Sequence, residues 1–431
     1  MVHTNLTTAV DHLMAPPLTV AVIGAGAAGL AVGRALKTEG HEFVIYEKSE
    51  KLGGTWLYDP RVESDPLSLD PNREIVHSSL YHSLRTNLPR ELMGFPDYPF
   101  STEKNRDPRT FPGHEEVLQF LNEFATKFGL VESIRFKTEV IRVERVDLRN
   151  DRWVVESRNI ESSSNELFDA VVVCNGHYTI PNVADFPGRE KWPGKQIHSH
   201  NYRVPDPYKD QIVVVIGHGA SARDISVEIS NVAKQVHLSS RSPNFDISNF
   251  EYRDNMSQHS KIDYANENGE VVFQDGVVVH PDIILHCTGF KYGFPFLKSE
   301  GIVTVEDGRV GPLYRHVFPP KVGPNLSFIG LPYTGIGMHM IDFQAKWLAH
   351  VLSGKARLPS VEEMEAEVQR HYREMEEKGI PKHHTHCLHL QLDYLDQIAN
   401  LVGLEGVDEA SRSLFKRVVF EFLNGEAPNR A

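Results

Sequence analysis

Cysteine is scarce in this chain of 431 residues, which contains three: Cys174, Cys287 and Cys387. None of them stands in a C-x-x-C pair, and their number is odd. The sequence therefore predicts neither a disulfide framework nor two closely spaced redox thiols. This pattern excludes a disulfide reductase and favours a reducing compartment, the cytoplasm.

Basic residues are also in the minority, because 45 Lys and Arg face 58 Asp and Glu, for a formal net charge of -13. That balance excludes a broad nucleic-acid or anionic-membrane surface, which needs clustered cations. No stretch approaches the roughly 20 apolar residues of a transmembrane helix. Residues 1–17 lack the basic start and the apolar run of a signal peptide. We expect a cytoplasmic protein without nucleic-acid or membrane partners, and the sequence leaves open whether it forms a homo-oligomer.

The chain does contain a clear strand–turn–helix–strand pattern near its beginning. Leu18–Ile23 is a continuous apolar, largely β-branched run typical of a buried parallel strand. A glycine-rich turn follows, then a predicted helix over Leu30–Glu39 and a second strand over Phe43–Tyr46. Gly24, Gly26 and Gly29 fit G-x-G-x-x-G, and Glu47 ends the second strand about 20 residues on, as a ribose-binding acid should. An acid here suits an unphosphorylated ribose, that of FAD or NAD.

The same pattern recurs downstream, with a strand over Gln211–Ile216, a helix over Arg223–Ala233 and a strand over Val236–Ser239. The turn carries Gly217, Gly219 and Ser221, and Ala222 stands at the third glycine position. Arg241 follows the second strand where an NAD site would carry an acid. A guanidinium can bind a 2′-phosphate through paired hydrogen bonds, so this unit favours NADPH. The alternative for Arg241 is a solvated surface residue.

Two more apolar strands, Ala170–Cys174 and Ile283–Cys287, bracket the second unit, and Leu326–Ile329 is a later strand. We predict an α/β fold with two Rossmann-like dinucleotide-binding domains, the second inserted into the first. The predicted FAD-binding domain spans 1–178 and 291–431, and the predicted NADPH-binding domain spans 179–290. Ser360 and Glu363 predict a capped helix over residues 360–378. Residues 150–151 and 159–165 look like turns or loops.

These motifs resemble those of the flavin-containing monooxygenases. Trp192–Tyr202 is similar to that family's F-x-G-x-x-x-H-x-x-x-Y/F fingerprint, with Trp in place of the first Phe. Gly53–Trp56 resembles the family's FAD-loop motif, and Asn87–Pro99 resembles its active-site asparagine segment. The resemblance runs from about Thr19 to about His386. Four runs resemble the plant S-oxygenase branch in particular: Ser64–Pro71, Ser83–Pro89, Trp192–Arg203 and Arg309–Pro320.

The resemblance implies an FAD- and NADPH-dependent monooxygenase. NADPH reduces FAD, O2 gives a C4a-hydroperoxyflavin, and a thioether sulfur takes one oxygen atom to become a sulfoxide. The implied substrates are S-alk(en)yl-cysteines or methylthioalkyl glucosinolates. Two alternatives stay open: an N-oxygenase of the same mechanism, and an NADPH oxidase or quinone reductase that transfers no oxygen to an organic substrate.

The resemblance also names site residues. Asn87 is the implied catalytic amide near flavin and nicotinamide, the alternative being a turn residue before Pro89. Gly54 and Trp56 are implied FAD-loop residues, and Gln344 is an FAD-contact candidate whose alternative is a helix-surface residue. The cluster His383, His384, His386, Cys387 and His389 matches no standard zinc spacing, so no metal is predicted. His198 and His200 stand in the fingerprint, where a structural role at the domain junction is as well supported as a catalytic one.

Overall fold

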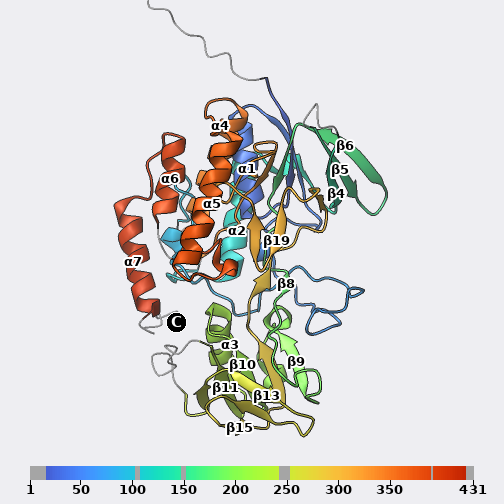
Figure 1. Ribbon diagram of the computed structural model, residues 1–431, viewed down its shortest axis with the longest axis vertical. Helices are drawn as coiled ribbons and strands as arrows, with labels where there is room; N and C mark the ends of the chain where they lie inside the picture. Colours follow the sequence, from blue (N-terminus) through green and yellow to red (C-terminus); the bar gives the residue numbers. More distant parts are fainter. Residues whose placement is uncertain (1–15, 102–106, 147–151, 242–252, 390–391, 424–431) are drawn as a thin grey trace, which may run out of the picture.

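The computed structural model describes residues 16–101, 107–146, 152–241, 253–389 and 392–423. The chain folds into two lobes that stand one above the other (Figure 1). Each lobe is built on a five-stranded parallel sheet. The predicted turn at residues 150–151 lies outside the described residues.

The sheet of the larger lobe has the order β21-β7-β1-β2-β3, and every pairing in it is parallel. Its strands are β21 (Leu326–Phe328), β7 (Ala170–Val173), β1 (Thr19–Ile23), β2 (Glu42–Tyr46) and β3 (Ile134–Arg135). The four β7 residues are all buried, which explains their unbroken apolar run.

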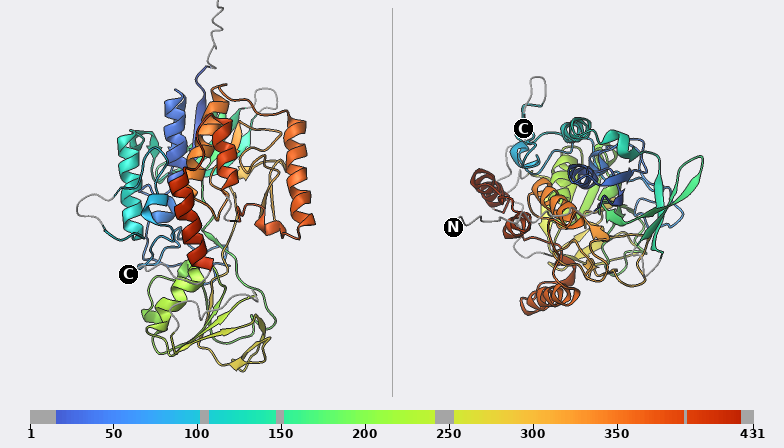
Figure 2. Two further views of the ribbon diagram at one scale, coloured as in Figure 1. Left: turned by 90° about the vertical axis from the view of Figure 1, so that its left-hand side faces the viewer. Right: turned by 90° about the horizontal axis from the view of Figure 1, so that it is seen from above.

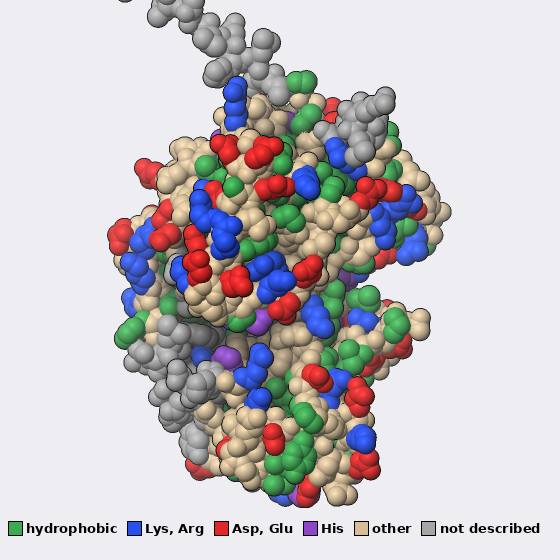
Figure 3. Space-filling model, in the orientation of Figure 1, with side chains coloured by type: hydrophobic (Ala, Val, Ile, Leu, Met, Phe, Trp, Pro, Cys, Tyr) green, Lys and Arg blue, Asp and Glu red, His purple; other side chains and the backbone are tan. Residues whose placement is uncertain are grey.

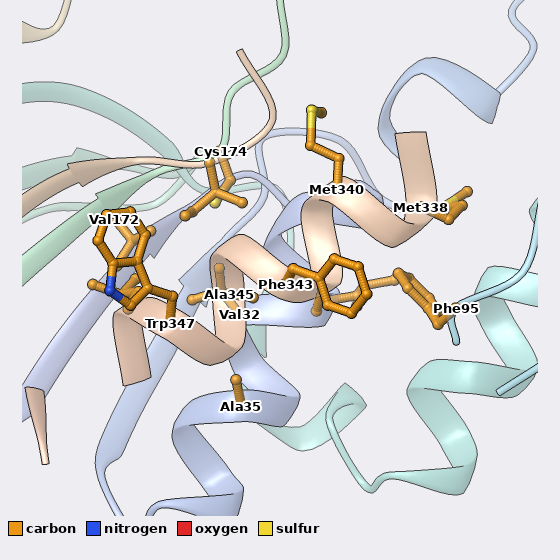
Figure 4. Packing of buried hydrophobic residues seen from close by; sticks show 14 of the residues in the cluster. Val32, Ala35, Phe95, Val172, Cys174, Met338, Met340, Phe343, Ala345 and Trp347 are labelled. Carbon is orange, nitrogen blue, oxygen red and sulfur yellow. The ribbon is translucent and has the colours of Figure 1, made fainter. Parts of the chain in front are cut away.

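Helices α1 (Ala27–Thr38) and α4 (Gly337–Leu352) pack against each other on this sheet. Figure 4 shows their contact, in which Val32 and Ala35 of α1 lie close to Phe343 and Ala345 of α4. Helix α2 (His114–Lys127) packs beside α1 through Phe120 and Phe124. A four-stranded sheet, β18-β4-β5-β6, covers the other side of the lobe. Its strands are β18 (Leu297–Lys298), β4 (Glu139–Arg145), β5 (Trp153–Arg158) and β6 (Ser163–Phe168).

The sheet of the smaller lobe has the order β12-β11-β10-β16-β9 and is parallel throughout. Its strands are β12 (Met256–His259), β11 (Gln235–Ser239), β10 (Ile212–Ile216), β16 (Ile283–His286) and β9 (Lys195–His198), with helix α3 (Ala220–Ser230) against it. A three-stranded sheet lies on its other face: β13 (Ile262–Ala265), β14 (Val271–Phe273) and β15 (Val278–Val279). The chain enters this lobe after β7 and leaves it before β21, so one Rossmann-like unit is inserted into the other, as predicted.

Two linkers join the lobes, and they pair with each other as a short antiparallel ladder of β8 (Ile180–Pro181) and β17 (Phe290–Lys291). Because β8 follows β7 and β17 follows β16, the carboxyl ends of both parallel sheets point toward this ladder. Ligands of open α/β sheets bind beyond the carboxyl ends of the strands. We therefore expect both predicted cofactors to bind at these carboxyl ends, between the lobes.

The remaining elements lie on the larger lobe. The hairpin β19 (Thr304–Glu306) and β20 (Arg309–Gly311) precedes helices α5 (Val361–Glu377), α6 (Asp393–Leu401) and α7 (Glu409–Leu423). Figure 2 shows α7 along the outside of the larger lobe. Ser360 and Glu363 form the predicted capping box at the start of α5. Within the described residues, no helix combines the length and apolar character needed to cross a membrane.

Some predicted boundaries were wrong. Helices α1 and α3 begin three residues earlier than predicted, because the last residues of each glycine-rich turn already belong to the first helical turn. The loop predicted over residues 159–165 extends only to residue 162, since Ser163 pairs with Arg158 and opens strand β6. The polar composition of this segment suggested a loop, and pairing with β5 overrides that preference.

Candidate active site

The first glycine-rich turn joins β1 to α1 under tight steric limits. Gly24 has φ +105°, and a Cβ there would lie 2.6 Å from the carbonyl oxygen of Cys174 at the end of β7. A Cβ on Gly29 would lie 1.8 Å from the carbonyl oxygen of Gly24. The two glycines therefore allow the turn and the close packing of α1 on β1.

A second loop, which contains 3-10 helix η1 (Gly54–Trp56), lies against this turn. The Gly53 amide donates to the Ala25 carbonyl at 3.0 Å. A Cβ on Gly54, whose φ is +56°, would lie 2.9 Å from the Cα of Gly26. The structure thus brings together Gly26, Gly54 and Trp56, which the sequence singled out in separate motifs.

The Glu47 carboxylate lies at the same turn and is buried. Its Oε2 accepts from the Ala25 amide at 2.9 Å, and its Oε1 accepts from the Ser49 amide at 2.8 Å. Oε1 also accepts from the Ser49 hydroxyl, so Oε2 is the oxygen that keeps acceptor capacity for a ribose hydroxyl. Gly26 has no side chain with which to cap α1, so the first-turn amides stay available to a pyrophosphate. The residues present fit the adenosine diphosphate half of FAD.

The turn between β10 and α3 repeats this geometry in the smaller lobe. Gly217 has φ +129°, and a Cβ there would lie 2.3 Å from the carbonyl oxygen of Cys287 at the end of β16. Gly219 differs from Gly26, because a Cβ on it would meet no described atom within 4 Å. Ser221 lies in the first turn of α3. The open space above Gly219 fits a second dinucleotide whose phosphates approach the backbone.

Arg241 follows β11 and is exposed. His218, within the glycine-rich turn, lies near it: the His218 Nδ1 and the Ser240 hydroxyl are 3.2 Å apart. Burial lowers the pKa of His218, and the positive charges of Arg223 and Arg241 lower it further. Sequence reasoning missed His218 and Arg223, although basic residues in a phosphate-binding turn were a signal that could have identified them. Three basic side chains thus gather where a 2′-phosphate is expected.

Asn87 is exposed, on a segment fixed from both sides. The Thr86 amide donates to the Pro112 carbonyl at 3.0 Å, and the Thr86 hydroxyl donates to the Leu88 carbonyl at 2.7 Å. Arg85 bridges to Gly113, directly before α2, and α2 contacts the η1 loop. The exposed amide of Asn87 therefore belongs to a rigid segment that adjoins the first glycine-rich turn through α2.

Gln344 lies on α4 and is fully buried, so the helix-surface alternative was wrong. Its Oε1 accepts from the Gly330 amide at 3.0 Å, and its Nε2 donates to the Tyr394 hydroxyl at 2.7 Å. Gly330 follows β21 and lies beside Ala28, at the start of α1. Because both ends of the amide have protein partners, Gln344 holds the loop after β21 against α1. A single sequence could not show this burial, because α6 contributes the partner.

The fingerprint residues His198–Asn201 lie between the smaller lobe and residues 63–79, whereas Trp192 belongs to the core of the smaller lobe. The His198 amide donates to the Pro66 carbonyl at 2.9 Å. The His200 Nε2 lies 3.3 Å from the Glu63 carboxylate, and its Nδ1 lies 2.7 Å from the Ser79 hydroxyl. Both histidines are fully buried. These bonds hold the two parts of the chain together at the junction, while the His198 Nε2 has no hydrogen-bond partner among the described residues.

The cysteines at the ends of the two sheets are poor nucleophiles. Burial raises the pKa of the Cys174 thiol, and it raises the pKa of Cys287 to about 12. Both thiols stay protonated at neutral pH, whereas disulfide exchange needs a thiolate. Thiol redox chemistry at the carboxyl ends of the sheets is therefore not supported.

In the histidine-rich segment, the His384 ring lies 4.5 Å from the His383 ring and 6.0 Å from the His389 ring, whereas His386 has other neighbours. His386 is buried and forms hydrogen bonds to Val310 and to His316. Burial lowers the pKa of His384, and the positive charge of Arg241 in the other lobe lowers it further. Among the described residues, no three His, Cys, Asp or Glu side chains are placed to hold a metal ion.

The model of the "Flavin-binding monooxygenase-like" family matches residues 18–264 and 254–415. The chain is 55% identical to "Flavin-containing monooxygenase FMO GS-OX5" of Arabidopsis thaliana over 393 residues, 90% of this chain and 85% of that protein. The solved "S-allyl-L-cysteine S-oxygenase from Allium sativum" is 48% identical, covers 97% of this chain and 95% of its own, and superposes with a TM-score of 0.92. Tmm from Pelagibacter sp. strain HTCC7211 is 28% identical over 93% of this chain and 90% of its own, with a TM-score of 0.78.

Proposed function

Since the chain belongs to the flavin-binding monooxygenase-like family, whose cofactors are FAD and NADPH, we propose that it converts small polar thioethers to sulfoxides. Its substrates are S-alk(en)yl-cysteines or methylthioalkyl glucosinolates. One oxygen atom of O2 enters the sulfoxide, and the other leaves as water with the electrons of NADPH.

The observation that carries this proposal is the pair of equivalent glycine-rich turns, one in each lobe. Gly24 lies against Cys174 and Gly217 lies against Cys287, in the same geometry at the carboxyl edge of each sheet. Both edges point toward the ladder of β8 and β17, so the residues that would hold the two dinucleotides lie on facing edges of the two sheets. The similarity to an S-allyl-L-cysteine S-oxygenase supports sulfur as the acceptor.

The chain's own residues bind and orient the two cofactors. The start of α1 binds the FAD pyrophosphate, Glu47 accepts from its ribose, and Gln344 acts through Gly330. The start of α3 and Arg241 bind NADPH. The predicted domain boundaries, 1–178 with 291–431 and 179–290, stay part of this proposal.

FAD supplies the redox chemistry when bound, because it takes a hydride from NADPH and passes oxygen to the substrate. The protein's task is to orient the reactants and to exclude water. Asn87 donates and accepts hydrogen bonds at the reacting end of the cofactors. Sulfur suits this chemistry at neutral pH because it keeps its lone pair, whereas most amines are protonated.

The proposal includes a small-molecule substrate as the partner and a cytoplasmic location. The formal net charge of -13 supports a small-molecule partner, since it disfavours binding to polyanions such as nucleic acids. Three free cysteines, two of them buried, support a reducing compartment.

The test is oxygenation by the FAD-loaded enzyme with NADPH and three substrates: S-allyl-L-cysteine, a methylthioalkyl glucosinolate and a tertiary amine. We expect one added oxygen on a thioether, seen by mass spectrometry, with about one NADPH consumed for each sulfoxide. A higher kcat/KM for the amine would make the protein an N-oxygenase. NADPH consumption without an oxygenated product would make it an oxidase.

A further inference from the structure

A group of aromatic side chains lies on the two linkers and on the loop after β21. We define the linker aromatic cluster as His177, Tyr178, Phe290, Tyr292 and Tyr333. The His177 ring lies 4.3 Å from the Tyr178 ring and 5.0 Å from the Tyr292 ring. The Tyr178 ring lies 5.7 Å from the Phe290 ring in an edge-on arrangement.

This cluster borders the first glycine-rich turn along two separate paths. His177 stands three residues after Cys174, whose carbonyl lies at Gly24. The Tyr292 hydroxyl donates to the Leu331 carbonyl at 2.7 Å, directly after Gly330, which lies beside Ala28. The cluster therefore lies at the carboxyl edge of the FAD sheet, between that sheet and the linkers.

Tyr333 closes the cluster from the C-terminal side. It follows β21 in the same loop as Leu331, and its backbone bridges to Cys387. Burial raises the pKa of Tyr292, and the neighbouring Tyr178, Tyr333 and Cys387 raise it further. These three side chains are thus close to Tyr292, although they come from segments more than 40 residues apart.

Tyr178 is an exposed member of the cluster. Its surface is 44% exposed, yet burial raises the pKa of its hydroxyl. Tyr178 is therefore accessible to a ligand while protein surrounds its hydroxyl group. The molecular surface is hollowed between the two lobes, and histidine side chains gather at this hollow (Figure 3).

His177 is partly exposed as a residue, yet both of its ring nitrogens are shielded from solvent and have no hydrogen-bond partner among the described residues. In His386, by contrast, Nε2 contacts Val310 and Nδ1 contacts His316. Burial lowers the pKa of His177 to about 4, so its ring is neutral at pH 7 and offers one donor and one acceptor. Leaving such atoms unpaired is costly, which points to a ligand as their partner.

We infer that the linker aromatic cluster is the thioether subsite, in which the tyrosine rings hold the sulfur chain and a His177 N–H donates to an oxygen of the substrate's polar head. This inference rests on the proposed function. Thioether sulfur packs well against aromatic rings. The oxygen belongs to a carboxylate in a cysteine-type substrate and to a hydroxyl in a sugar-bearing one. His177 is thus a substrate-positioning residue, and it takes no part in the chemistry of the flavin.

The experiment compares S-allyl-L-cysteine with allyl methyl sulfide, which has the same allyl thioether but no polar head. His177→Phe keeps the ring and removes its nitrogens. We expect the KM for S-allyl-L-cysteine to rise about tenfold or more, as for a lost hydrogen bond to a charged group, with kcat nearly unchanged. The KM for allyl methyl sulfide should change less than about threefold, and one of the amide variants, His177→Asn or His177→Gln, should restore most of the affinity.

His280→Gln is the matched control, since that side chain is 66% exposed in the smaller lobe. FAD content and melting temperature establish that each variant is folded, and His177→Asn and His177→Gln keep the test available if His177→Phe does not fold. Equal KM changes for both substrates, slower reduction of FAD by NADPH, or no change at all would each overturn the inference. If the unaltered enzyme oxygenates neither thioether, the proposed function fails instead, so the two failures are distinguishable.

Discussion

At the scale of single residues, we propose that Arg241 determines the preference for NADPH over NADH. Its exposed guanidinium stands at the end of β11, with His218 and Arg223 close by. We predict that Arg241→Ala raises the KM for NADPH about tenfold or more, because a charge-assisted contact to phosphate contributes roughly 1.5 to 3 kcal/mol. NADH has no 2′-phosphate, so its KM should barely change. Steady-state kinetics with both cofactors checks this, and equal shifts for the two would contradict the assignment.

We propose that Asn87 acts after the reduction of FAD, from a segment that is held against the start of α2. We predict that Asn87→Ala leaves the reduction of FAD by NADPH within about threefold, because the segment is held by Thr86 and not by the Asn87 side chain. Oxygen should be diverted into hydrogen peroxide, since the amide no longer orients the oxygenating step. Stopped-flow spectroscopy measures the rate of FAD reduction, and a peroxide assay measures the oxygen that is lost as hydrogen peroxide. Slow reduction with tight coupling would show that Asn87 serves the hydride transfer instead.

At the scale of elements, the two strand–turn–helix units make different demands on their glycines. We predict that Gly29→Ala prevents FAD binding and destabilises the larger lobe, because the new Cβ would meet the Gly24 carbonyl and separate α1 from β1. Gly219→Ala should leave the melting temperature within about 2 °C, because its Cβ enters open space, while it raises the KM for NADPH.

The predictions for Gly29→Ala and Gly219→Ala are checked by FAD absorbance, melting curves and NADPH kinetics on the purified variants. A stable, FAD-loaded Gly29→Ala protein would refute the close packing of α1 on β1. Unchanged NADPH kinetics in Gly219→Ala would refute the approach of phosphate to this turn.

At the scale of the whole molecule, we predict that histidines with lowered pKa values contribute to the response to acid. Burial lowers the pKa of six histidines to about 3 or 4: His177, His198, His237, His286, His339 and His386. Below their ordinary pKa near 6.5, the unfolded chain takes up protons that the folded chain does not. The stability from these groups is therefore fully present above pH 6.5 and is lost as the pH falls toward 4.

Each such histidine can lower the free energy of unfolding by up to about 1.4 kcal/mol for each pH unit in this window. We predict a steep fall in the melting temperature of the FAD-loaded enzyme between pH 6.5 and 4.5, and little change between pH 7 and 8. Carboxylates add their loss at lower pH, since hydrogen bonds from His200, Ser68 and Arg73 hold the pKa of Glu63 at about 2 against its burial. A melting temperature that is flat from pH 7 to 5 would contradict the neutral state of the histidines.

The sequence by itself determined the local units of this protein. Several features depend only on residues that are close together in the chain, so their patterns are visible without a fold. These features are both glycine-rich turns, the β-branched strands beside them, Glu47 and the Ser360–Glu363 capping box. The order of these units also determined that one domain is inserted into the other. The family resemblance then indicated a flavin monooxygenase before any contact was known.

Only the tertiary structure decided which distant segments meet. Tyr81, from the larger lobe's part of the chain, packs into the core of the smaller lobe, Gln344 is buried against Tyr394, and His177 lies beside Tyr292. These contacts join residues that are 50 or more positions apart, and each depends on how sheets, linkers and C-terminal helices pack. Local propensity carries no record of such packing, because burial and pairing are properties of the folded surface that a side chain faces.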